Sequence, residues 1–152
     1  MDDGLTVGLE NPSSVEAIQL MRELSELLKE ITGESGESSF NLEDLVNYRS
    51  IFAIARYHGE PIGCGALRPI NETTAEFKRM YSRKNGIGIG SKILTYLERE
   101  AKNLKYSIIR LETRLINEKA VQFYEVKGYY RIPNYGRYIG RVDAICFEKK
   151  LV

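Results

Sequence analysis

The chain has 152 residues, of which 43% are hydrophobic and 28% charged, and its 22 Lys and Arg against 21 Asp and Glu leave a net charge of +1. This length predicts a single domain over residues 1–152, and the near-neutral charge argues against a nucleic-acid or membrane-surface partner, which would favour a basic excess. The start of the chain has no basic segment with an apolar run, which argues against a secretion signal. The whole chain has only two cysteines, Cys64 and Cys146, so we expect a cytoplasmic protein without a disulfide scaffold.

The first elements predicted are a strand and an amphipathic helix. Residues 5–9 alternate as a short strand. Asn11 is expected to cap the helix, with Pro12 at its first position. Apolar residues then recur at spacings of three and four from Val15 to Ile31, which indicates a helix with one buried face. A polar loop follows at residues 33–39, and a second short helix is predicted over residues 42–48.

The pattern then changes to strands. Further strands are predicted at residues 51–57, 62–68, 73–81, 106–113 and 144–149. A helix is expected after Gly90, and another from a capping Asn117 through Lys127, which Gly128 would end in a left-handed conformation. Strands with helices before, within and after them predict an α/β or α+β sandwich.

A glycine-rich segment, residues 85–90, joins the strand at 73–81 to the following helix. Glycines let the backbone approach a ligand, and unpaired amides at a helix start attract phosphate. The segment is not a P-loop, because Ser91 follows Gly90 with no Lys between them. It is not a dinucleotide fingerprint either, because its glycines alternate at 86, 88 and 90. A flexible connection is the alternative.

This segment resembles the acetyl-CoA pyrophosphate loop of the GNAT superfamily of N-acetyltransferases, Arg/Gln-x-x-Gly-x-Gly/Ala. It matches at Gly88 and Gly90 and departs at Asn85, where Arg83 or Lys84 could supply the missing charge. The resemblance implies acetyl-CoA as co-substrate. It also implies contacts from the end of the strand and from the loop, at Met80, Ser82, Asn85, Gly86, Gly88, Ile89, Gly90 and Ser91.

A second motif lies beyond the next strand. Asn117, Ala120, Phe123, Tyr124 and Gly128 with the following tyrosine fill Asn-x-x-Ala-x-x-Phe-Tyr-x-x-x-Gly-Phe/Tyr, which resembles a second motif of the same superfamily. Its helical residues lie within about a turn of one another. The resemblance adds Asn117, Ala120, Phe123 and Tyr124 to the cofactor site. It implies a mixed, mostly antiparallel sheet with splayed central strands.

The resemblance also implies direct transfer of the acetyl group to an amine, without an acyl-enzyme. Tyr124 occupies the general-acid position, and the amide of Met80 that of the oxyanion donor. The acceptor needs a base, because an alkylammonium with a pKa near ~10 cannot attack. Glu76 is the first candidate, on the same strand face as Lys78 and Met80 by two-residue alternation, and Glu112 is the second; water held by backbone could also serve. For either glutamate an ordinary ion pair is the alternative.

The expected acceptor is the primary amine of a small molecule, held between the 33–40 loop and the tyrosines at 135–138. Arg68 is a candidate for meeting a carboxylate on it. Two alternatives stay open: a protein or peptide N-acetyltransferase, and a non-catalytic acyl-CoA-binding module. No metal site is expected, because no cluster of His, Cys and carboxylates has metal-ligand spacing. A homodimer and a monomer are both compatible with the sequence.

Overall fold

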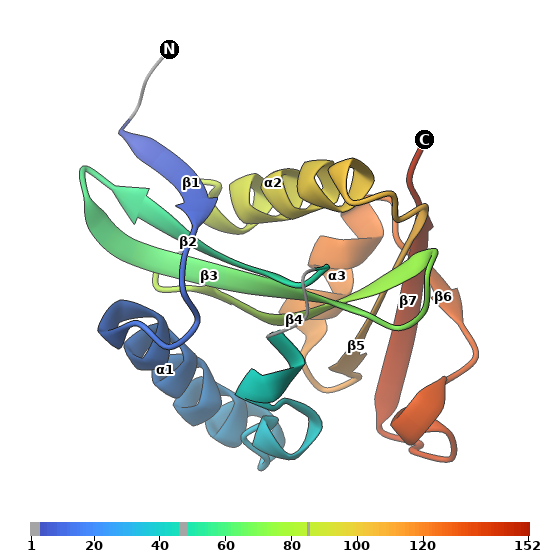
Figure 1. Cartoon of the computed structure of the whole chain (residues 1–152). Coiled ribbons are helices and arrows are strands. Elements are labelled where there is room, and N and C mark those ends of the chain that lie inside the picture. Colours follow the sequence, from blue (N-terminus) through green and yellow to red (C-terminus); the bar gives the residue numbers. More distant parts are fainter. Residues whose placement is uncertain (1–3, 46–48, 85) are drawn as a thin grey trace.

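A computed structural model describes residues 4–45, 49–84 and 86–152, and these build a seven-stranded sheet (Figure 1). The strand order is β1-β2-β3-β4-β5-β7-β6, and every neighbouring pair is antiparallel except β4 and β5, which run parallel. The strands are β1 (Leu5–Leu9), β2 (Ile51–Tyr57), β3 (Glu60–Pro69), β4 (Thr74–Ser82), β5 (Ile108–Arg114), β6 (Tyr130–Ile132) and β7 (Ala144–Lys150). The mixed, mostly antiparallel sheet confirms the fold predicted from the sequence.

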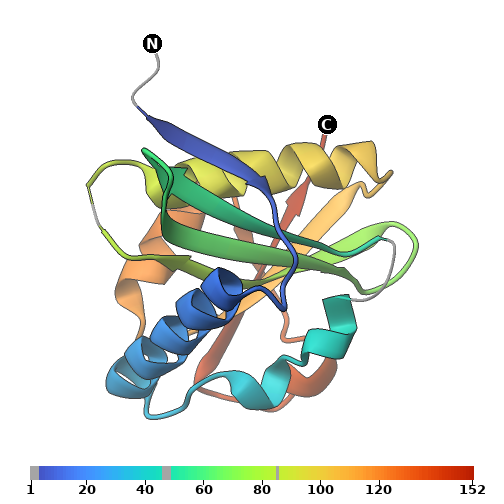
Figure 2. The ribbon, with the colours of Figure 1, turned by 60° about the vertical axis from the view of Figure 1, so that its left-hand side comes forward.

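Helices cover both faces of this sheet. The three α-helices are α1 (Val15–Thr32), α2 (Ile89–Asn103) and α3 (Glu118–Val126), and short 3-10 helices are η1 (Glu37–Ser39), η2 (Leu42–Leu45) and η3 (Gly136–Tyr138). Figures 1 and 2 both show α2 on one side of the sheet and α1 on the other. The helix expected over residues 42–48 is only the 3-10 turn of η2, and residues 46–48 lie outside the described part of the chain.

The start of α1 differs from the prediction. Ser14, not Asn11, caps the helix, and its Oγ accepts a hydrogen bond from the amide of Ala17 at 3.1 Å. Asn11 instead closes a local turn, its side-chain oxygen accepting from the amide of Ser13 at 2.8 Å. Serine and asparagine are both strong capping residues, and Ser14 is the one that directly precedes Val15, the first residue of the helix.

The strand β6 was not predicted, because its three residues lie inside a tyrosine-rich segment with no clear alternation. It pairs with β7 from Tyr130↔Glu148 to Ile132↔Cys146 and forms the sheet edge. The preceding helix and its end follow the prediction: Asn117 caps α3, accepting from the amide of Ala120, and Gly128 takes a φ of 92°.

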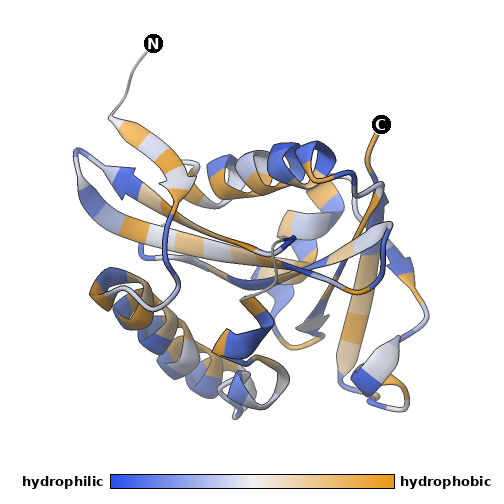
Figure 3. Cartoon of the chain, viewed as in Figure 1, coloured by the Kyte–Doolittle hydropathy of each residue, from blue (hydrophilic) through white to orange (hydrophobic). Residues whose placement is uncertain are grey.

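The core divides between the two faces of the sheet. On one face α2 and α3 pack against a large apolar cluster that includes Phe77, Ile93, Leu97, Leu111 and Phe147. On the other face α1 packs against a smaller cluster with Phe52, Ile54 and Ala66. Figure 3 shows hydrophobic residues along much of β7, whose first four residues are buried. Within the described ranges, no helix combines the length and apolar character needed to cross a bilayer.

Candidate active site

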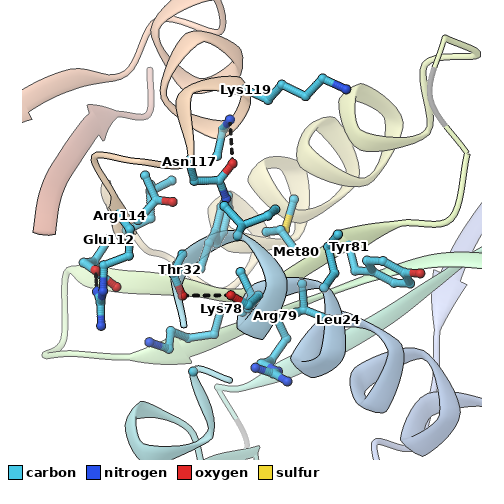
Figure 4. Close-up of a pocket in the computed structure, with 18 of the residues that line it drawn as sticks. Leu24, Thr32, Lys78, Arg79, Met80, Tyr81, Glu112, Arg114, Asn117 and Lys119 are labelled. Atoms are coloured by element: carbon cyan, nitrogen blue, oxygen red, sulfur yellow. Dashed lines mark hydrogen bonds and ion pairs between the residues drawn. The ribbon is translucent and has the colours of Figure 1, made fainter. Parts of the chain in front are cut away.

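The site begins where β4 and β5 separate. The two strands pair only from Thr74↔Ile108 to Glu76↔Arg110, and a cavity of about 540 Å³ opens beyond that point. This volume lies within the range of small-molecule pockets. Residues of β4, β5, α1, α3 and the loop after α1 line the cavity (Figure 4). The splayed strands are therefore the feature that creates room for a ligand.

A bulge in β4 changes the face of the sheet that the following side chains of this strand meet. The β3–β4 register shifts between Cys64 and Ala66, and opposite this shift Arg79 has a φ of 56°, in the left-handed region that non-glycine residues rarely adopt. The bulge inserts an extra residue, so the side-chain alternation reverses. Lys78 faces the α1 side, whereas Met80 packs toward α2, where its Sδ would lie 2.6 Å from a Cβ at Gly65. The prediction that Glu76, Lys78 and Met80 share one face is thus wrong for Met80.

The glycine loop leads into α2 as predicted. Gly86 and Gly88 have φ values of 87° and 78°, and no atom lies within 4 Å of the position a Cβ would take on either. Gly88 precedes Ile89, the first residue of α2. This open backbone at a helix start is suited to phosphate. The third glycine has another function: Gly90 lies in the helix, where a Cβ would meet the ring of Phe123 at 3.4 Å.

The remaining loop residues take different positions. Ser82 lines the cavity, and its hydroxyl donates to the carbonyl of Lys84 at 2.5 Å. Ile89, the first residue of α2, is buried in the core, and Ser91 lies in the first turn of the same helix. Asn85 falls outside the described residues, so its contact with the phosphates stays a prediction.

Arg83, a candidate for the missing positive charge of the loop, is already bound within the protein. Its Nε and Nη2 atoms donate to the carboxylate of Glu23 in α1, both at 2.7 Å, and Nη1 donates to the carbonyl of Pro61. The hydrogen bond from Arg83 lowers the pKa of Glu23 to about 2. This pair connects α1 to the end of β4, beside the cavity.

The helix α3 places three of its four motif residues at the cavity, and their contacts with the cofactor stay a prediction. Asn117, Ala120 and Tyr124 line it, while Phe123 packs toward Gly90 of α2. Tyr124 is 8% exposed, and burial raises the pKa of its phenol. Its hydroxyl therefore stays protonated through the neutral range, which is the state that a proton donor requires.

The two candidate glutamates lie in different surroundings. Glu76 is 3% exposed and does not line the cavity; it accepts hydrogen bonds from Arg68 Nε at 2.9 Å and from the Tyr135 hydroxyl at 2.5 Å. Glu112 does line the cavity, where Arg114 contacts its carboxylate. Both glutamates thus form ion pairs with arginine, but Glu112 alone of the two reaches the cavity wall.

Arg68 also has partners within the protein. Besides Glu76 it contacts Asp44 of η2, so the guanidinium joins β3, β4 and η2. Sequence reasoning overlooked Lys78 as a cavity residue, although its alternation with Glu76 placed it on the correct face of the strand. Lys78 lines the cavity, and its Nζ donates to the hydroxyl of Tyr138 at 2.7 Å.

The loop after α1 closes one side of the cavity. Thr32, Glu34 and Gly36 line it, and Gly33 ends α1 with a φ of 83°. The side chain of Arg141, from the segment before β7, donates to Glu34 at 2.6 Å. The loop predicted to cover the acceptor is therefore fastened at the cavity.

Comparisons with known proteins agree with this architecture. Residues 18–129 match the model of the acetyltransferase (GNAT) family. A relative from Azospirillum brasilense, described as an IAA acetyltransferase, is 28% identical over 150 residues, covering 97% of this chain and 98% of that protein.

Solved structures show the same fold. A Klebsiella pneumoniae structure, provisionally described as an acyl-CoA N-acyltransferase, has a TM-score of 0.85 and 26% identity, covering 99% of this chain and 100% of that chain. A GNAT family acetyltransferase from Elizabethkingia anophelis, solved with acetyl-CoA bound, has a TM-score of 0.70 and 19% identity, covering 99% of this chain and 100% of that chain. At that identity the second likeness concerns the fold alone.

Proposed function

The chain belongs to the GNAT family of acetyltransferases, and on that premise we propose that it transfers an acetyl group from acetyl-CoA to the primary amine of a small molecule. The observation that carries this proposal is the cavity between β4 and β5. The α3 motif residues Asn117, Ala120 and Tyr124 line it together with an acidic residue, Glu112. Donor and acceptor can meet there.

The residues fit acetyl-CoA in two respects. The left-handed backbone at Gly86 and Gly88 leaves open space at the start of α2, where amides can bind the pyrophosphate. Ala120 contributes only a methyl group to the cavity wall, which leaves room for the pantetheine arm. The bound thioester supplies the activated acetyl group, and the remaining steps depend on the side chains of this chain.

The acceptor amine must lose a proton before it can attack. Of the two candidate glutamates only Glu112 lines the cavity, so we assign it the base before Glu76, which is occupied by Arg68 and Tyr135. Glu34, the other carboxylate of the lining, pairs with Arg141. Tyr124 lines the cavity with its phenol protonated at neutral pH, and we assign it the protonation of the leaving thiolate. Met80 follows the bulge residue directly, on the part of β4 that β5 does not pair, and its amide stabilises the developing oxyanion.

A panel of free amino acids, aminosugars, polyamines and peptides, incubated with acetyl-CoA, tests the proposal through thiol release and the mass of the product. We expect acetylation of small amines. Acetylation of peptides or proteins alone would refute the small acceptor and favour a protein N-acetyltransferase. Binding of CoA without turnover of any amine would favour a binding module.

A further inference from the structure

We propose that Lys78, positioned by the hydroxyl of Tyr138, forms an anion-binding subsite in the acceptor cavity, and that the acceptor is an amine that also carries a carboxylate. This inference rests on the proposed function and deepens it, because it specifies the second group on the acceptor. Arg68 had been the candidate for this role, but its guanidinium lies between Asp44 and Glu76.

The position of Lys78 follows from the register of the parallel strands. β4 and β5 pair at Glu76↔Arg110, and Lys78 and Glu112 lie two residues further along their strands. Paired residues in a parallel sheet point to the same face, so Lys78 and Glu112 stand at the same level on either side of the opening. Both line the cavity. In Figure 4, Lys78 and the Glu112–Arg114 pair lie on the side of the cavity away from Tyr81.

This arrangement offers opposite charges to one small ligand. Glu112 is suited to the ammonium group of an arriving acceptor, and Lys78 to a carboxylate on the same molecule. On the η3 side, Lys78 Nζ donates to the Tyr138 hydroxyl at 2.7 Å, and this contact holds the lysine side chain in place. Lys78 Nζ also lies 5.4 Å from the centre of the Tyr138 ring. A small amine without a carboxylate would engage only one of the two charges.

The charges around Lys78 also favour an anion. Burial lowers the pKa of Lys78 to about 8, and three guanidinium groups, Arg68, Arg79 and Arg137, act in the same direction. Glu76 acts in the opposite direction, but it already accepts from Arg68 and from the Tyr135 hydroxyl. Glu112 faces this region from β5 and Cys146 from β7. Asp44 and Glu76 both pair with Arg68, and Arg114 pairs with Glu112. The positive charge that a ligand carboxylate would meet therefore comes from Lys78, Arg79 and Arg137.

Matched acceptors test the subsite. Phenylalanine and phenethylamine, and likewise ornithine and putrescine, differ only by a carboxylate. Because the two members of a pair also differ in the basicity of the amine, the decisive quantity is the change in their kcat/KM ratio between protein variants. We expect Lys78→Met to lower the preference for the amino acid by about 10- to 100-fold, the range of a hydrogen bond to a charged group.

Two further variants control the result. Lys102→Met removes a positive charge from the exposed side of α2, away from the cavity, and should leave the preference as in the wild type. Tyr138→Phe removes the hydroxyl that contacts Lys78 and should lower the preference to a smaller extent, which also provides a test if Lys78→Met does not fold. A preference unchanged in both Lys78→Met and Tyr138→Phe would overturn the subsite while leaving the acetyltransferase intact.

Binding separates failure of the subsite from failure of the proposed function. Calorimetry with CoA-saturated protein measures amino-acid binding without turnover. Amino-acid binding that Lys78→Met weakens supports the subsite even if no small amine is acetylated. If wild-type protein neither binds amino acids nor acetylates small amines, both proposals are wrong.

Discussion

At the scale of single residues, the chemistry depends on groups whose surroundings set their protonation and direction. Tyr124 is buried in α3 beside the cavity, and Glu112 reaches the cavity from β5 with Arg114 as its partner. Glu76 is also a glutamate on a strand, but its carboxylate accepts hydrogen bonds from Arg68 and Tyr135. Glutamate therefore lines the cavity at position 112, whereas at position 76 it forms a buried ion pair and hydrogen bond outside the cavity.

Replacing Tyr124 by phenylalanine should lower kcat and kcat/KM together, by about 10²-fold, a value typical of a lost general acid. The affinity for acetyl-CoA should change little, because the aromatic ring and its packing remain. Steady-state kinetics with saturating substrates and calorimetry of CoA binding measure the two effects. A variant as fast as the wild type would make Tyr124 a packing residue.

The two glutamates can be separated by their glutamine variants. Glu112→Gln should lower kcat/KM by about 10²-fold or more and flatten the rise of the rate with pH, since a positioned base is lost. Glu76→Gln should keep the shape of the pH profile but lower the free energy of unfolding by about 1–3 kcal/mol, because a buried partner of Arg68 and Tyr135 is weakened. The reverse pattern would return the base to Glu76.

At the scale of secondary-structure elements, the loop before α2 depends on its backbone conformation. Gly88 has a φ of 78°, whereas Gly90 is an ordinary helical residue whose Cβ position lies 3.4 Å from Phe123. An L-residue in the left-handed region costs about 1–2 kcal/mol. Gly88→Ala should therefore destabilise the protein by about 1 kcal/mol and weaken CoA binding several-fold.

Gly90→Ala is the matched comparison for Gly88→Ala. It adds the same methyl group at normal helical φ, where alanine is favoured over glycine and the Phe123 ring lies at van der Waals distance, so we expect no loss of stability, measured by urea unfolding of both variants. Equal losses in the two variants would show that the left-handed backbone is not what the loop requires.

A second element-scale feature is the connection between α1, its following loop and the bulge of β4. Arg79 is 8% exposed and donates to the carbonyls of Met21 at 3.0 Å and of Ser35 at 3.3 Å, and it also contacts Ser25. The loop that lines the acceptor side of the cavity is thus attached to the residue before Met80. Burial lowers the pKa of this guanidinium.

Arg79→Met keeps the apolar stem but removes these donors. We expect a loss of about 1.5–3 kcal/mol in the free energy of unfolding and faster amide hydrogen exchange in residues 33–38. Arg22→Met, on the exposed side of α1, is the control and should change neither quantity. Unaltered exchange in the Arg79 variant would contradict the connection between loop and bulge.

At the scale of the whole molecule, the partly buried Lys78 should make stability depend on pH. Its pKa is about 8 in the folded state and 10.5 as the reference for the unfolded chain. Between these values the unfolded chain binds more protons, so the contribution of Lys78 to stability rises with pH there and is lowest below pH 8. Relative to Lys78→Met, the wild type should gain roughly 2–3 kcal/mol between pH 8 and 10.5, because each unit of pKa shift corresponds to about 1.4 kcal/mol.

The comparison with the variant is needed because Cys64 has the opposite effect. Burial raises the pKa of its thiol from 9.0 to about 12, so ionisation of the unfolded thiol lowers stability in the same range of pH, equally in both proteins. Urea unfolding at pH 8 and pH 10 measures the difference. A difference that stays constant with pH would show that Lys78 is not held in a desolvated position.

The sequence by itself determined most of the elements and identified the two motif segments, at residues 85–90 and 117–129. Hydrophobic periodicity predicted α1, α2 and the long strands, and local signals predicted the cap at Asn117 and the left-handed Gly128, since all of these depend on residues within a few positions. The motif at 117–129 also placed Tyr124 and Ala120 on the side of α3 that lines the cavity.

Tertiary structure decided which of the charged residues line the cavity. The bulge at Arg79 reversed the alternation of β4, and the separation of β4 from β5 left Glu112 and Lys78 in the cavity. Two candidate site residues bind partners far away in sequence: Glu76 accepts from Tyr135, and Arg83 donates to Glu23. The sequence alone predicted neither partner. Residue spacing encodes local periodicity, whereas ion-pair partners and a bulge depend on how strands distant in sequence come together.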